Sequence, residues 1–65
     1  MSAPIERREV LFEFTVAGAF MKVAAIDATS GIEIVVLGPA QSARMDLKKL
    51  ALAKLRRRLA QDGVL

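Results

Sequence analysis

Side chains that could carry out acid–base or metal chemistry are scarce in this chain of 65 residues. With no His and no Cys, it offers no group that titrates near neutral pH unperturbed, no thiolate nucleophile and no Cys/His zinc site. None of the hydroxyls stands in a G-x-S-x-G or S-x-x-K context, and they belong to Ser2, Thr15, Thr29, Ser30 and Ser42. These residue types argue against nucleophilic catalysis and zinc chemistry.

The acidic residues and the glycines are equally unsuited to a built site. The seven carboxylates form no D-x-D-x-D calcium loop, and the four glycines lie too far apart for a phosphate-binding loop. We therefore predict that the protein is not an enzyme and binds no metal and no cofactor. An enzymatic function would return only if the fold gathered Lys22, Asp27 or Glu33 in one pocket.

Length and composition predict a small domain that needs help to complete its core. A chain this short buries only about 60% of its unfolded surface, and no disulfide or metal can staple this one. Yet 54% of the residues are hydrophobic, so disorder is not expected. We predict that a second copy or a partner completes the core.

The pattern along the chain predicts three strands and one helix. Residues 1–7 are expected to form a flexible polar tail, and residues 8–65 a single domain. Apolar residues alternate over 9–16, 20–27 and 32–37, with turns at Gly18 and Gly31 and a stop at Gly38-Pro39. Residues 42–62 are rich in Ala, Leu, Lys and Arg, which favours a helix. The predicted fold class is α+β: a three-stranded antiparallel meander followed by a C-terminal helix.

Helix and loop ends carry their own signals. Ser42 is a candidate N-cap, although the helix could also begin at Pro39, and Gly63 suits the position after the last turn. Asp27 is placed to accept hydrogen bonds from backbone N–H groups further along its loop.

Both faces of the predicted sheet are apolar, and one helix can cover only one of them. We assign Val10, Phe12, Phe14, Val16, Met21, Val23, Val35 and Leu37 to the first face. The second face is assigned Leu11, Ala24, Ile26, Ile32, Ile34 and Val36. A monomer would expose this second patch, and the helix carries a wider apolar stripe than one sheet needs. We therefore predict a homodimer, domain-swapped or not, whose interface contains Leu11, Ile26, Ile32, Ile34, Val36 and Leu52; the alternative is a weakly stable monomer.

Positive charge is concentrated in the predicted helix. Residues 1–40 carry a net charge of −2 and residues 41–65 one of +5, which gives the total of +3. One interpretation is a nucleic-acid contact through Lys49, Arg56, Arg57 and Arg58. Another is a helix lying on an anionic membrane surface. The third is a solvated helix face, which the absence of Tyr and Trp for base stacking favours.

Targeting signals are lacking in the sequence. The first ten residues contain no apolar signal stretch, and no run of 18 apolar residues occurs. We expect no transmembrane segment and a cytoplasmic location.

Several strings along the chain resemble a known family. They are Arg8–Phe14, Lys22–Asp27, Ser30-Gly31 and Gly38-Pro39-Ala40. The chain resembles a family of very small alphaproteobacterial proteins catalogued as a domain of unknown function. That resemblance implies a bacterial cytoplasmic protein, and it brings no activity, substrate or site residue. The function favoured by the sequence is therefore an uncharacterised accessory module that binds another macromolecule without catalysis.

Overall fold

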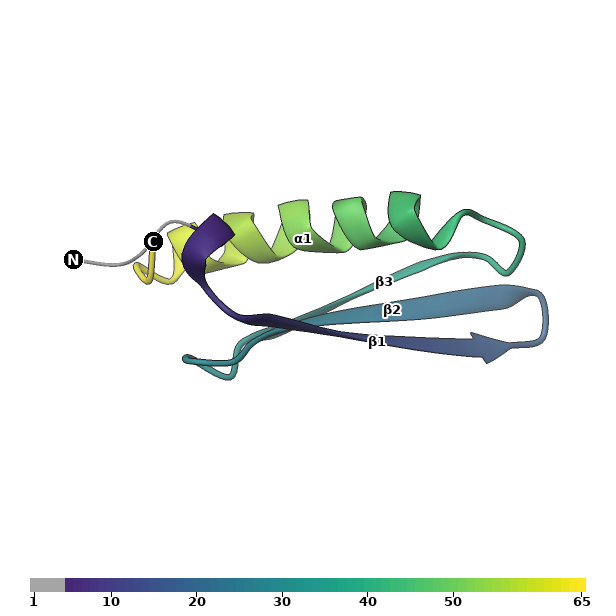
Figure 1. The fold of residues 1–65 in the computed structure, drawn as a ribbon, viewed down its shortest axis with the longest axis horizontal. Helices are drawn as coiled ribbons and strands as arrows, with labels where there is room; N and C mark the ends of the chain where they lie inside the picture. Colours follow the sequence, from purple (N-terminus) through teal and green to yellow (C-terminus); the bar gives the residue numbers. More distant parts are fainter. Residues whose placement is uncertain (1–4) are drawn as a thin grey trace.

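Three antiparallel strands followed by one helix make up the fold, as predicted (Figure 1). The computed structural model describes residues 5–65. A short 3-10 turn, η1 (Ile5–Arg7), precedes strands β1 (Val10–Ala17), β2 (Phe20–Asp27) and β3 (Glu33–Pro39), and helix α1 (Arg44–Gln61) ends the chain. The strand order β1-β2-β3 makes β2 the central strand.

Glycine makes both hairpin turns possible. Gly18 has a φ of 60° in the two-residue turn between β1 and β2, and Gly31 has a φ of 77° in the loop before β3. These values lie in the left-handed region, which side chains with a Cβ rarely adopt. Both turns were predicted at these positions, because the glycines interrupt the apolar alternation there.

The register between β2 and β3 corrects one prediction. Val23 pairs with Val36 and Ala25 with Ile34, so these β3 side chains share the face of Phe12 and Phe14. Their assignment to the opposite face was wrong. Val35, which pairs with Ala24, lies on that opposite face instead. A shift of one residue in the pairing register moves every side chain of a strand to the other face of the sheet.

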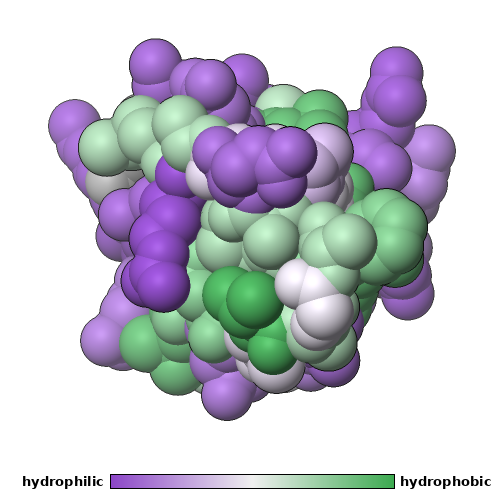
Figure 2. All heavy atoms as spheres, turned by 90° about the vertical axis from the view of Figure 1, so that its right-hand side faces the viewer, coloured by the Kyte–Doolittle hydropathy of each residue, from purple (hydrophilic) through white to green (hydrophobic). Residues whose placement is uncertain are grey.

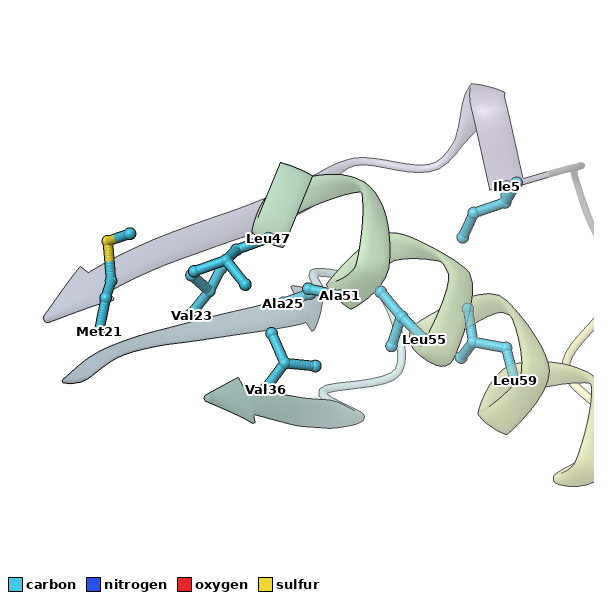
Figure 3. Close-up of a cluster of buried hydrophobic side chains, with 9 residues drawn as sticks. All are labelled: Ile5, Met21, Val23, Ala25, Val36, Leu47, Ala51, Leu55 and Leu59. Atoms are coloured by element: carbon cyan, nitrogen blue, oxygen red, sulfur yellow. The ribbon is translucent and has the colours of Figure 1, made fainter. Parts of the chain in front are cut away.

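Helix α1 packs over β2 and β3 and forms the core with them (Figures 1 and 3). We call this side of the sheet the covered face and the other side the open face. Sheet side chains point up toward one row of helix side chains. The buried apolar residues of this core are Ile5, Met21, Val23, Ala25, Val36, Leu47, Ala51, Leu55 and Leu59.

The connection between sheet and helix differs from the prediction at two places. Strand β3 continues through Gly38 to Pro39, where it still pairs with Met21 and Phe20 of β2. The N-cap position is Ala43, without a side-chain hydrogen bond, so neither Ser42 as N-cap nor a start at Pro39 is correct. Gly38 allows the close approach, since a Cβ there would lie 2.7 Å from Cδ2 of Leu47. The helix ends as predicted, with Gly63 at a φ of 75°.

The start of the described chain is not a polar tail. Ile5 is buried in the core beside the C-terminal half of α1 (Figure 3). The part of the predicted tail formed by residues 1–4 lies outside the described residues. Burial of Ile5 places Arg8 at the end of the sheet, next to Asp27.

Candidate interaction surfaces

A buried ion pair joins the N-terminal segment to the end of β2. Arg8 donates to both carboxylate oxygens of Asp27, from Nε to Oδ1 at 2.9 Å and from Nη2 to Oδ2 at 2.7 Å. The backbone N–H and the hydroxyl of Ser30 also donate to Oδ2, at 2.9 and 2.6 Å. The Asp27 side chain is fully shielded from solvent and fully paired. The predicted bonds from Asp27 into its loop are thus confirmed.

Electrostatics at this ion pair favour the charged forms. The hydrogen bonds from Arg8, helped by those from Ser30, hold the pKa of Asp27 well below its usual range, although burial opposes this shift. The arrangement is structural in character, since both carboxylate oxygens accept hydrogen bonds from the protein itself. Lys22 and Glu33 share the open face, whereas Asp27 lies on the covered face, so the three are not gathered in one pocket.

The open face is an apolar surface that no other element among residues 5–65 covers. On this face, small, large and charged side chains of neighbouring strands lie next to one another. Exposure is high for four large residues: Leu37 at 67%, Phe20 at 59%, Leu11 at 48% and Val35 at 45%. Ala24 and the half-buried Ile26 lie between them on β2. Patches of this kind usually mark contact surfaces in soluble proteins.

The predicted interface residues divide between this face and the core. Leu11 and Ile26 lie on the open face, as predicted. Val36 is buried in the core, and Ile32, Ile34 and Leu52 are partly buried against it. Phe20, Val35 and Leu37 replace them on the open face, and only the register could have revealed this.

A second surface follows β1, on the covered side of the sheet. Here α1 does not extend fully over the strand, so Phe12 and Phe14 remain half-buried. Cations from the first turns of α1 lie over both rings: Lys48 Nζ is 4.8 Å from the centre of Phe12, and Arg44 Cζ is 5.2 Å from that of Phe14. Cation–π contacts of this length are favourable. Phe12 and Phe14 therefore contact cations of α1 as well as the core.

Cations of α1 point in several directions. Arg44 and Lys48 face β1, whereas Lys54 and Arg57 line a shallow hollow on the helix with Leu50. Arg58 forms an exposed pair with Asp62 at 3.1 Å. Of the residues predicted for nucleic acid, Lys49, Arg56 and Arg57 are exposed, as is Arg58. The charge thus does not gather into one track along the helix.

Figure 2 shows the end of the molecule that carries the β1–β2 turn and the β3–α1 loop. Apolar atoms occupy much of this end, and hydrophilic groups stand around its margin. Within residues 5–65, no group of three or more acidic residues is placed to hold a metal ion. In the described part of the chain, no helix has the length and apolarity needed to cross a bilayer.

Comparison with known proteins identifies the family. A model of the domain of unknown function DUF6898 matches residues 7–62. The chain belongs to this family. Its matched range begins just before Arg8 and ends at Asp62, and therefore includes the whole sheet, the ion pair and α1. No curated protein matches the chain, and no solved structure does.

Proposed function

We propose that this DUF6898 protein is a non-catalytic interaction module that works as a homodimer joined through the open face. The exposed apolar set of Leu11, Phe20, Val35 and Leu37 carries the proposal. Contact with a second copy would remove these side chains from water, at roughly 25 cal/mol for each Å² of apolar surface buried. The dispersed helix cations also favour a protein partner over nucleic acid.

Charges on the open face support a second copy as the occupant. Two open faces can pack against each other about a two-fold axis that lies between the sheets and runs perpendicular to the strands. Each strand then lies over the same strand of the second copy and runs in the opposite direction. Leu37 then contacts Val35 of the second copy, and Lys22 comes beside its Glu13. Each favourable contact occurs twice, as an isologous interface requires.

The size of the face sets the expected affinity. Three strands spaced by about 4.8 Å, of seven or eight residues at about 3.3 Å each, present roughly 400 Å² per copy. A standard interface buries about 800 Å² per partner. We therefore expect a weak dimer, with a Kd on the order of micromolar to tens of micromolar.

Light scattering across a concentration series tests this proposal. Wild-type protein should change from one chain mass to two as its concentration rises from about 1 µM to about 1 mM. Leu37→Glu should remain monomeric over that range, because the carboxylate would be buried in the interface without a partner. Leu50→Glu is the matched control, since Leu50 is similarly exposed but lies on α1.

Charge exchange sharpens the test. Lys22→Glu should weaken the dimer, and combination with Glu13→Lys should restore it. A wild-type chain that stays monomeric at all concentrations would contradict the proposal, as would dimerisation by folded Leu37→Glu. A nucleic-acid absorbance signal that co-purifies with the protein and disappears at high salt would instead support binding through α1.

The cellular setting of this module is part of the proposal. The resemblance to very small alphaproteobacterial proteins supports an accessory role in the bacterial cytoplasm. Cell fractionation of a tagged full chain tests that location, and we expect to recover the protein in the cytoplasmic fraction.

A further inference from the structure

Strand β1 carries an open hydrogen-bonding edge. Among the described residues, no strand pairs with it on the side away from β2. Ala17 and Phe20 flank a two-residue turn, so their backbones bond to each other, and alternate residues of β1 point the other way. The outward N–H and C=O groups therefore belong to Val10, Phe12, Phe14 and Val16.

The other edge of the sheet is less suited to accept a strand. By the same alternation, the outward backbone positions of β3 include Pro39, which has no N–H to donate. Strand β1 has no proline, and Glu13 is its single charged residue over eight positions. A long, mostly apolar edge of this kind is a template for an added strand.

Positive charge lies directly beside this edge. Arg44 and Lys48 reach from α1 over Phe14 and Phe12, the two residues at the middle of the strand. A strand added next to β1 would place every second side chain on the covered side, near these two cations. Carboxylates at those positions would be attracted, and lysines would be repelled.

We propose that the edge of β1 binds an extended segment of another protein, antiparallel to β1, with acidic residues at alternate positions facing Arg44 and Lys48. Backbone hydrogen bonds supply the binding, and the acidic side chains supply the selectivity. In such a complex, the apolar or β-branched side chains between the acidic residues would extend the open face of the sheet. The half-buried Phe12 and Phe14 would become covered as well.

A second copy of this chain fits the edge poorly. Pairing β1 with β1 about a two-fold axis near the middle of the strand would set Phe12 and Phe14 of the two copies side by side. It would also bring the Arg44 and Lys48 side chains of both copies together over the axis. That like-charge contact favours an acidic partner over a homodimer at this site. The edge is separate from the open face, so this proposal goes beyond the proposed dimer and does not depend on it.

Synthetic peptides test the edge directly. The probe is a fluorescently labelled Thr-Asp-Val-Asp-Val-Asp-Thr peptide, titrated with the full chain and followed by anisotropy. We expect a Kd on the order of 100 µM, and binding about tenfold weaker when lysine replaces each aspartate. In an antiparallel pair, residues whose N–H faces β1 also turn their side chains to the covered face. N-methylation of the aspartate amides should therefore abolish binding, whereas N-methylation of the valine amides should change it less than about twofold.

Protein variants locate the acidic selectivity. Arg44→Gln with Lys48→Gln should weaken binding of the acidic peptide about fivefold, in line with two exposed charge pairs. Lys49→Gln with Lys54→Gln removes the same charge from other positions on α1 and should leave the affinity within about twofold. Far-UV circular dichroism verifies that both double variants remain folded.

Four results would overturn the proposal. The first is an affinity that does not change when the aspartate amides are methylated, because charge alone would then account for binding. The second is equal weakening by the two double variants. The third is no binding of the acidic peptide by the wild-type chain. Arg44 and Lys48 would then serve to prevent aggregation through the edge of β1. A single-stranded oligonucleotide that displaces the peptide with higher affinity would also overturn it, in favour of nucleic acid.

Discussion

Both faces of the sheet carry large apolar side chains, but in very different environments. On the covered face, Val23 and Ala25 are fully shielded by α1, whereas Leu37 and Val35 on the open face lie largely in water. Neighbouring residues of one strand, Val36 and Leu37, thus have opposite fates. Hydrophobicity alone does not decide burial here. Whether a side chain is buried depends on the face of the sheet to which it points, because a single helix covers only one face.

The covered face is itself unequal across the sheet. Helix α1 packs on β2 and β3, and the cations Arg44 and Lys48 rather than apolar residues lie over the rings of β1. The protein therefore leaves two surfaces for contacts: the open face and the margin of β1. Both arise because 18 helical residues cannot cover the whole of a three-stranded sheet.

The largest contrast between the faces is expected for leucine truncation. Leu55→Ala should lower the free energy of unfolding by about 3 kcal/mol, because it leaves a cavity in a fully buried site. Leu37→Ala, at an exposed site, should change it by less than about 0.5 kcal/mol in the monomer. Urea unfolding followed by far-UV circular dichroism at low protein concentration measures both.

Concentration separates packing within the chain from packing between chains. Any loss in Leu37→Ala that grows with protein concentration reports the dimer, since association stabilises the folded state by mass action. The loss in Leu55→Ala should be present at every concentration. Similar losses in both variants at low concentration would mean that the open face is covered within the chain itself.

The next largest loss of stability is expected at the buried ion pair of Arg8 and Asp27, which lies on the covered face at the end of β2. Asp27→Asn should destabilise the protein at pH 7, because the largely buried Arg8 guanidinium loses its charged partner. The loss should be smaller than that from the cavity in the core, because the amide oxygen can still accept a hydrogen bond. The pKa of Asp27 is lowered in the folded protein, so its contribution is complete above about pH 4 and is lost as the pH falls below that value. The variant should therefore lose less stability than the wild type between pH 7 and pH 3.

An exposed pair supplies the control for this acid effect. Asp62 accepts a hydrogen bond from Arg58 one turn away, and both side chains are substantially exposed. Asp62→Asn should change the free energy of unfolding by less than about 0.5 kcal/mol and keep the wild-type response to acid. An Asp27→Asn variant with the same acid response as wild type would contradict the assigned role of the ion pair. Urea midpoints at the two pH values decide this.

The strands, the turns and the helix could be predicted because their signals are local. Alternation identifies β1 and β2, and Gly18 and Gly31 mark the turns because a left-handed backbone requires them. The faces of β3 could not be predicted so simply. Its parity depends on the path of the Asp27–Gly31 loop, where Gly31 N–H bonds to the Asp27 carbonyl and Asp27 N–H to that of Ile32. If the loop were longer or shorter by one residue, Val35 and Val36 would exchange the faces of the sheet on which they lie.

The candidate sites show the same division between local and distant information. Asp27 was identified as a loop acceptor, since Ser30 is only three residues away. Its stronger partner, Arg8, is 19 residues distant and directly follows the predicted tail of residues 1–7, and no local pattern links it to Asp27. The cations over Phe12 and Phe14 likewise depend on where α1 crosses the sheet, and no spacing in the sequence indicates this.

The smallest of these effects tests how closely α1 approaches β3. Gly38→Ala places a Cβ within 2.7 Å of the Leu47 methyl, but that methyl ends a flexible side chain that can turn aside. We expect a loss of about 1 kcal/mol or less from this overpacking, and a larger loss for Gly38→Val, whose branch cannot avoid Leu47 so easily. Combining Gly38→Ala with Leu47→Ala should cost less than the sum of the two single changes, because the truncated side chain leaves room for the new methyl. Additive losses in urea unfolding would show that Gly38 is not there for helix contact. The close approach of α1 to the covered face would then need another explanation.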